Sequence, residues 1–161
     1  MRISFSWLKK YVPLADSVTA EEVAEALKLS TVEVEEVEHS GASLVGVVVG
    51  RVVSIEKHPK ADRLQVCQVS IGKETLQVVC GGSNVREGMD VAFAGVGVSV
   101  RWHGEGDPIV LEKTTIRGVD SYGMICASDE IGLLGRFPKK DEKEIVDLTE
   151  YHFASGTALA E

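Results

Sequence analysis

The 161-residue chain lacks the features that mark membrane and secreted proteins. No stretch approaches the roughly 20 consecutive apolar residues that a membrane-spanning helix needs. The amino terminus has one basic residue and no extended apolar core, so it does not predict a secretory signal. The three cysteines are odd in number and scattered, which argues against a disulfide framework. We expect buried free thiols and a protein of the reducing cytoplasm.

Patterns for catalysis and metal binding are missing as well. The four histidines and three cysteines show no CxxC or HxxxH spacing, so the sequence predicts no metal site. It has no G-x-S-x-G nucleophile elbow, and the glycine-rich segment 80–84 lacks the lysine of a phosphate-binding P-loop. Asp129 and Glu130 are adjacent, so on a strand their carboxylates point apart. We therefore expect no catalytic residue and no cofactor in this chain.

The chain also lacks a strongly basic composition. Its formal net charge is −8 at pH 7, and the acidity lies in the flanks. Residues 45–140 hold 12 Lys/Arg and 11 Asp/Glu, whereas the remainder holds 5 and 14. A tight, autonomous nucleic-acid binder presents a clearly basic surface. Any nucleic-acid binding by the near-neutral centre should therefore be weak or assisted by other parts.

Residues 1–43 predict the first part of a small α/β domain. A capping box pairs a Thr with the Glu three residues later, and each side chain bonds the other residue's backbone N–H. Alternation of valine and glutamate predicts a strand with one acidic face. The expected elements are a strand at 2–5, a helix at 7–11 capped by Ser6, a second helix behind a Thr19/Glu22 capping box, and a strand at 32–38. The small residues at 40–43 mark a domain boundary.

The centre of the chain has the composition of β structure. Runs of β-branched and apolar residues predict strands at 44–56, 64–71, 75–80, 90–96 and 109–116, with a further apolar strand after Ser121. Gly72 to Glu74 should close a hairpin. Glycines inside the strands allow bulges and sharp coiling, which favours a small closed barrel of the five-stranded OB type over a sandwich.

The carboxyl-terminal part predicts less regular structure. The charged segment 138–147 indicates a linker or exposed loop. Residues 155–161 have the composition of a capped helix start with no helix behind it, and an isolated helical turn is not stable. We expect the chain to be a fragment of a longer protein.

Polar and basic side chains gather where strands end. His58, Lys60 and Arg63 lie in the segment that joins the first two predicted strands, and Lys113 and Arg117 flank the last long one. Such loops, held by a rigid sheet, suit contacts with a phosphodiester backbone. For each lysine or arginine alone, a solvated surface charge is the alternative. Tyr122 is the only nearby ring, so base stacking is not predicted.

Three ordered motifs carry a family resemblance. They are H-P-x-A-D-R-L-x-V-C-x-V at 58–69, V-C-G-G-x-N at 79–84, and I-R-G-V-x-S-x-G-M-I-C-A-S at 116–128. Together they are similar to the EMAP II-like tRNA-binding module, which has an OB fold. That module occurs as a free tRNA-binding protein, appended to methionyl-tRNA synthetases, and inside the bacterial phenylalanyl-tRNA synthetase β subunit.

The flanks resemble the last of these hosts. Phe5-Ser6-Trp7-Leu8 and the acidic segment 32–35 are similar to the amino terminus of the β subunit, where the OB module is inserted in an α/β domain that resumes afterwards. The resemblance implies a first α/β part at 1–43, a tRNA-binding OB domain at 44–148, and a truncated resumption at 149–161. The fold class is then mainly β, a five-stranded OB barrel inserted in a small α/β domain.

The resemblance also implies function and partners. The parent enzyme is an (αβ)2 heterotetramer that uses ATP and magnesium to attach phenylalanine to tRNA, at a site in the α subunit. The fragment itself should not catalyse this ligation and should be an accessory tRNA-binding part. By family position, the tRNA-binding side chains would be Lys60, Arg63, Asn84, Lys113, Arg117, Ser121 and His58.

Two alternatives stay open. The barrel would be chiefly structural if it packs against other synthetase domains and touches tRNA little, which its near-neutral charge favours. It would be a free-standing dimeric tRNA-binding protein if the flanks belonged to no larger domain, which the α/β segments argue against.

Overall fold

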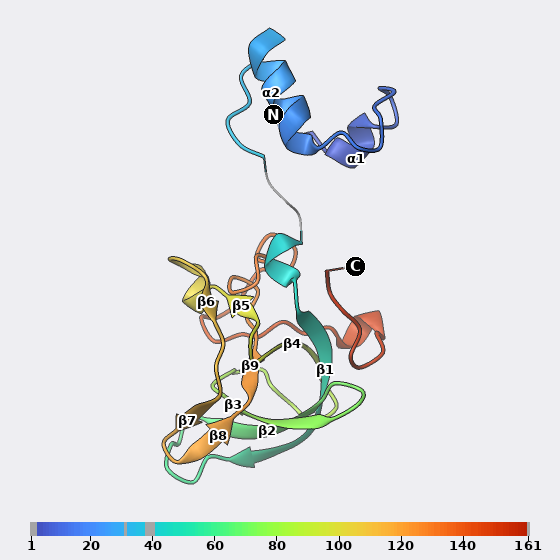
Figure 1. Ribbon diagram of the computed structural model, residues 1–161. Helices are drawn as coiled ribbons and strands as arrows, with labels where there is room; N and C mark the ends of the chain where they lie inside the picture. Colours follow the sequence, from blue (N-terminus) through green and yellow to red (C-terminus); the bar gives the residue numbers. More distant parts are fainter. Residues whose placement is uncertain (1–2, 31, 38–40, 161) are drawn as a thin grey trace. The chain divides into compact units, whose positions relative to one another are not determined.

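The computed structural model describes residues 3–30, 32–37 and 41–160 (Figure 1), which divide into two compact units within residues 1–40 and 41–161. The first unit is helical. Helix α1 spans Phe5–Leu8 and begins at Ser4, whose hydroxyl accepts the Trp7 N–H. The prediction of a helix at 7–11 capped by Ser6 was therefore wrong, because the helix begins two residues and ends three residues earlier. Ser4 and Ser6 both suit a cap, and Ser4 takes the role.

Helix α2, Ala20–Ser30, begins with the predicted capping box. The Thr19 N–H donates to Glu22 Oε2 at 2.9 Å, and the Glu22 N–H donates to Thr19 Oγ1 at 3.2 Å, which confirms it. The predicted strands of this unit are absent from its described residues, because 3–4 and 32–37 form no strand and 2 and 38 lie outside them. Alternation makes a strand only where a partner strand takes its backbone hydrogen bonds.

The second unit is a nearly closed antiparallel barrel, which confirms the mainly β, OB-type prediction (Figure 1). Its main sheet has the order β3-β2-β1-β4-β9. The strands are β1 Val47–Lys57, β2 Gln65–Ser70, β3 Thr75–Cys80, β4 Asp90–Gly95 and β9 Gly123–Ile125. The β2–β3 hairpin turns where predicted, with Gly72 at φ +89° and the Ile71 N–H donating to the Glu74 carbonyl.

Smaller elements complete the barrel. The strand predicted at 109–116 is divided into β6 Ile109–Val110, which pairs with β5 Ser99–Val100, and β7 Thr114–Ile116, which pairs with β8 Val119–Ser121. Short 3₁₀ turns lie at η1 Ala42–Leu44, η2 Trp102–Gly104 and η3 Thr149–Tyr151.

Hydrogen bonds between β3 and the β8–β9 segment close the barrel. The Tyr122 N–H donates to the Gln77 carbonyl at 2.9 Å, and Gln77 Nε2 donates to the Asp120 carbonyl at 2.8 Å. The Val79 N–H donates to Ser121 Oγ at 3.1 Å. These bonds join the first edge of the sheet to its last element, so the edge of β3 is not left open.

Strand β1 is long and serves both halves of the barrel. It pairs with β4 over 47–51 and with β2 over 51–57, with a register shift between Val52 and Ser54. Gly50 makes this path possible, because a Cβ there would lie 2.5 Å from Val69 Cγ1 and 3.1 Å from Phe93 Cβ. The glycine inside the strand thus marks a close approach rather than a loop.

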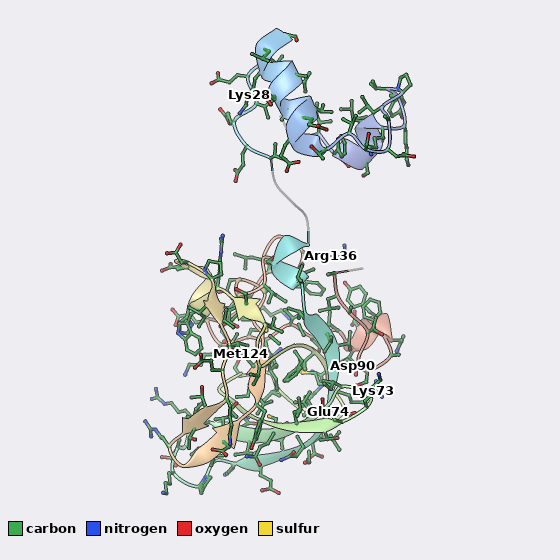
Figure 2. The ribbon with its side chains drawn as sticks, in the orientation of Figure 1. Lys28, Lys73, Glu74, Asp90, Met124 and Arg136 are labelled. Atoms are coloured by element: carbon green, nitrogen blue, oxygen red, sulfur yellow. The ribbon has the colours of Figure 1, made fainter. Side chains whose placement is uncertain are left out.

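The core is apolar and contains the three cysteines. One cluster lies around Val47, Val49 and Ile131, and the other around Val69, Val78 and Phe93. Met124, labelled in Figure 2, packs partly buried against the first cluster. Cys67, Cys80 and Cys126 are free and buried, as predicted, and burial raises the pKa of the Cys126 thiol well above its usual range.

The carboxyl-terminal segment packs on the barrel. The prediction of a linker or exposed loop at 138–147 was wrong for its last part, because Ile145 and Val146 are buried and the Val146 N–H donates to the Cys126 carbonyl. Residues 155–160 form no helix, contrary to the expected helix start, and residue 161 lies outside the described residues. Instead, the chain from 156 to 159 runs antiparallel along β1.

Candidate nucleic-acid interface

Two loops that are far apart in sequence meet at one end of the barrel. The first is the β1–β2 loop, residues 58–64, and the second is the β7–β8 turn at Arg117 and Gly118, drawn beside each other in Figure 1. The His58 Nε2–H donates to the Ile116 carbonyl at 3.0 Å, and Arg117 Nη1 donates to the Lys60 carbonyl at 3.3 Å. The loop and the turn therefore form one surface.

His58 lies inside this surface, with 5% of its area exposed. Its Nδ1 accepts the Lys60 N–H at 3.1 Å, while Nε2 faces the Ile116 carbonyl. A carbonyl only accepts and an amide N–H only donates, so these partners assign a neutral ring with its proton on Nε2. Both ring nitrogens are used within the protein, which leaves neither for a ligand.

Arg117 stands at the tip of a tight hairpin turn. Arg117 has φ +49° and Gly118 has φ +91°, the two positive values that a two-residue turn of type I′ needs. The Lys60 ammonium lies beside this turn, because a Cβ built on Gly118 would be 3.4 Å from Lys60 Nζ. Lys60 and Arg117 thus bring their charges to the same place from different elements, and both are exposed.

Lys113 is held by an acidic partner on the neighbouring strand. Its Nζ lies 2.8 Å from Asp120 Oδ2 and 4.9 Å from the centre of the Tyr122 ring. Thr115 Oγ1 also donates to Asp120 Oδ1 at 2.7 Å. The Lys113 ammonium, followed by the Thr115 hydroxyl, holds the pKa of Asp120 below its usual range, and Asp120 raises the pKa of Lys113. The charge of Lys113 is therefore largely compensated.

Asn84 and Ser121 use their polar atoms to hold the backbone. Asn84 Nδ2 donates to the Ile145 carbonyl at 3.0 Å, and the Ile145 N–H donates to Asn84 Oδ1 at 2.9 Å. Ser121 is 4% exposed; its hydroxyl accepts the Val79 N–H and donates to the Gly123 carbonyl. Asn84 fastens the segment after 138 to the barrel, and Ser121 helps to close the barrel.

The predicted residues thus fall into two groups. Lys60, Arg63 and Arg117 are exposed cations on the joined loops, and Lys113 is an exposed cation just before β7; within the described residues the Arg63 side chain has no hydrogen-bond or ion-pair partner. His58, Asn84 and Ser121 bond to the protein itself. Sequence reasoning missed Asp120, the counter-charge of Lys113. Gly118, between two short β-branched runs, is the signal that could have suggested a hairpin with Asp120 opposite Thr115.

Among residues 3–30, 32–37 and 41–160, no group of three His, Cys, Asp or Glu side chains is arranged to hold a metal ion. In the same ranges, none of the helices has the length and apolar character to cross a bilayer. The surface at the joined loops is cationic, and such a surface can bind anionic groups such as phosphates.

Known proteins similar to this chain bear on its family. A protein of Protochlamydia amoebophila, phenylalanine–tRNA ligase β subunit, is 42% identical over 99% of this chain and 19% of its own length. The protein of the same description from Parasynechococcus marenigrum is 46% identical over 83% of this chain and 16% of its own length. The chain thus spans about a fifth or less of these homologues.

A solved structure, the MetRS-related protein from Pyrococcus horikoshii, has a TM-score of 0.48 and 18% identity over 70% of this chain and 87% of its own, too low to bear on the fold or the function. The family model described as "Putative tRNA binding domain" matches residues 47–157, which include the whole main sheet of the barrel and both joined loops. The chain therefore belongs to the family of tRNA-binding domains.

Proposed function

We propose that this chain acts as the accessory tRNA-binding part of a phenylalanine–tRNA ligase β subunit. It contacts phosphates of the tRNA backbone through Lys60, Arg63 and Arg117. The observation that carries the proposal is the joining of the β1–β2 loop to the β7–β8 turn, which gathers cations from two elements on one surface of a tRNA-binding domain. The homologues, named as phenylalanine–tRNA ligase β subunits, supply the host enzyme.

The proposal gives the predicted site residues unequal roles. Lys113 joins the contact only after leaving Asp120, so its contribution is small. His58 holds the loops together, Asn84 and Ser121 hold other backbone segments, and none of the three touches the tRNA, since their polar atoms are already bonded. Lys60, Arg63 and Arg117 have no acidic partner among the described residues, and no aromatic ring lies among them, so the surface contacts the tRNA backbone rather than the bases. Binding by this chain alone is accordingly weak.

The rest of the reaction lies elsewhere in the enzyme. In the proposed setting, the chain works in the cytoplasm within an (αβ)2 assembly, and the ATP- and magnesium-dependent ligation takes place in the α subunit. A structural module that packs on other synthetase domains is the alternative, and it is favoured by the near-neutral charge of residues 45–140. The two functions differ in one measurable property, the salt-dependent affinity for tRNA.

A tRNA titration at low and near-physiological salt tests the proposal. The variant Lys60→Ala/Arg63→Ala/Arg117→Ala removes the proposed contacts. The matched control Lys73→Ala/Arg136→Ala/Lys140→Ala removes the same charge from other exposed positions, and Figure 2 shows Lys73 and Arg136 well away from the β7–β8 hairpin. Removing one phosphate-binding cation should flatten the plot of log K against log[salt] by about one unit.

The expected result is weak, salt-sensitive binding that the first variant abolishes and the control keeps. Equal losses of affinity in both variants would mean that tRNA responds only to net charge. Absence of binding by the unchanged chain would favour the structural module.

A further inference from the structure

The link between the two basic loops depends on one buried side chain. His58 joins the Lys60 N–H in its own loop to the Ile116 carbonyl at the start of the β7–β8 turn, with both bonds between 3.0 and 3.1 Å. The ring is 5% exposed, so water competes little for these bonds. Within the loop, the His58 N–H also donates to the Leu64 carbonyl, and this bond holds the backbone from which the imidazole side chain extends.

The second link between the loops is of a different kind. Arg117 Nη1 reaches the Lys60 carbonyl at 3.3 Å from an exposed side chain. If Arg117 contacts a phosphate, its guanidinium turns toward that charged acceptor, which is stronger than a neutral carbonyl. The Arg117 link then weakens at the moment of binding. The His58 link does not involve the ligand, so it is the one that persists in the complex.

Loop order affects affinity because free loops and long side chains lose conformational freedom when they bind. A β1–β2 loop held to the β7–β8 turn already places Lys60 and Arg63 at a fixed spacing from Arg117. Without the link, each loop would have to be ordered by the RNA itself. The same three cations would then bind with lower affinity, although every phosphate would keep its partner.

We propose that His58 is a positioning residue, which locks the β1–β2 loop to the β7–β8 turn so that Lys60, Arg63 and Arg117 meet the tRNA backbone as one pre-ordered group. This inference rests on the proposed function for its effect on affinity, but the lock itself exists without RNA. A direct contact of His58 with RNA, the role suggested by its place in the motif, predicts a different response to substitution.

The lock is tested first in the protein alone. Amide hydrogen exchange of Lys60 reports the bond to Nδ1, and NMR order parameters of the backbone amides of Arg63 and Arg117 report how well the two loops are held. His58→Asn keeps an acceptor near the Nδ1 position, and His58→Gln keeps a donor near the Nε2 position. The Lys60 amide should stay protected in the unchanged chain and in His58→Asn, and should lose protection in His58→Gln and His58→Ala. The order parameters at Arg63 and Arg117 should fall in His58→Asn and His58→Ala, which lose the bond to the Ile116 carbonyl. Fast exchange of the Lys60 amide in the unchanged chain, or order parameters that stay the same in His58→Ala, would overturn the lock.

The second test measures affinity and salt slope together. His58→Ala should weaken tRNA binding by about three- to tenfold while the salt slope stays the same, because the loops lose their order but keep all their cations. The two conservative variants should lie between. A slope flattened by about one unit would mean that His58 binds a phosphate as a cation, which would make it a direct ligand. An affinity as low in His58→Asn and His58→Gln as in His58→Ala, with the loops still ordered, would also indicate direct contact. Unchanged affinity would leave it without a positioning role.

A stability control separates positioning from general loosening. Val52→Ala removes buried volume from the barrel core, away from both loops, and should lower the unfolding temperature without changing tRNA affinity well below it. If Val52→Ala weakens binding as much as His58→Ala, the positioning role is overturned. If the unchanged chain does not bind tRNA, the proposed function fails. If binding requires Lys60, Arg63 and Arg117 but His58→Ala leaves the affinity unchanged, only this inference fails.

Discussion

Arg51 on β1 donates two hydrogen bonds of 2.7 Å to the carboxylate of Asp90 on β4, Nε to Oδ1 and Nη2 to Oδ2. The two residues are also paired in register, and Arg51 is paired with Ser70 of β2 on its other side. The Asp90 side chain, labelled in Figure 2, is fully buried, whereas that of Arg51 is 53% exposed. This two-bond ion pair therefore marks the point where β1 passes from one half of the barrel to the other.

The unequal burial predicts unequal costs of substitution. Arg51→Ala leaves the Asp90 carboxylate buried without a partner, whereas Asp90→Ala leaves an arginine that water can reach. We expect Arg51→Ala to lower the unfolding temperature clearly more than Asp90→Ala. The double variant should be more stable than Arg51→Ala alone. Thermal unfolding followed by circular dichroism measures all three, and a more damaging Asp90→Ala would contradict the prediction.

Removing the counter-charge of Lys113 should strengthen tRNA binding. Asp120→Asn keeps the size of the side chain and releases the Lys113 ammonium, now 2.8 Å from the carboxylate, for contact with a phosphate. We expect about two- to threefold tighter binding at low salt and a salt slope steeper by up to about one unit. Glu112→Gln removes one exposed negative charge without freeing an ion pair and serves as the control. Equal gains in both variants would show that only net charge matters.

The same pair predicts a shift in acid titration. Because the pKa of Asp120 is lowered in the folded chain, the pair stabilises the fold above the ordinary Asp range and loses this effect as pH falls through the lowered pKa. NMR titration of the Asp120 carboxyl carbon should give a midpoint below about 3.9. Lys113→Gln should move the midpoint up, and Thr115→Val should move it up by less, since Lys113 is the larger cause. An Asp120 midpoint that stays the same in Lys113→Gln would refute this account.

Glu130 should destabilise the fold when it is ionised. Its carboxylate accepts the Ala127 N–H at 2.7 Å, but burial raises its pKa. A carboxyl group with a raised pKa favours the fold below its unfolded pKa, and this contribution is lost as pH rises through the folded pKa. The gain in unfolding temperature from Glu130→Gln should therefore be larger at pH 7.5 than at pH 4. Glu142→Gln, an exposed position, should show no such difference.

Asn84 is expected to matter for stability and not for tRNA. Asn84→Ala removes both bonds to the Ile145 backbone and should cost about 2 kcal/mol of unfolding free energy. Urea unfolding measures the loss. At temperatures where the variant stays folded, its tRNA affinity should equal that of the unchanged chain. A lower affinity with an intact fold would make Asn84 a ligand after all.

Local patterns predicted much of the fold. Strands β2, β3 and β4 follow from β-branched runs bounded by turn residues, and the α2 capping box is decided by Thr19 and Glu22 alone. The predicted strand at 32–38 failed, since the valine–glutamate alternation says nothing about a partner. The tail along β1 was missed for the same reason, because its partner lies about a hundred positions earlier.

The candidate site shows the same limit. Residue type and position singled out the exposed cations, since charged residues in strand-end loops are usually exposed. The roles of His58 and Asn84 depended on acceptors and donors 58 and 61 positions away. A histidine or asparagine in a loop has the same local signal whether it faces a ligand or the backbone of a distant segment. Only the fold decides between the two.

The pairing of the tail with β1 has a consequence for how this barrel combines with other proteins. The Leu159 N–H donates to the Val47 carbonyl at 2.9 Å, so the polypeptide enters and leaves the barrel at neighbouring points. A unit with adjacent entry and exit can be spliced into a surface loop of a host without separating the two ends of that loop. The barrel therefore has the connectivity of an inserted domain, whose two chain ends meet a host at one place.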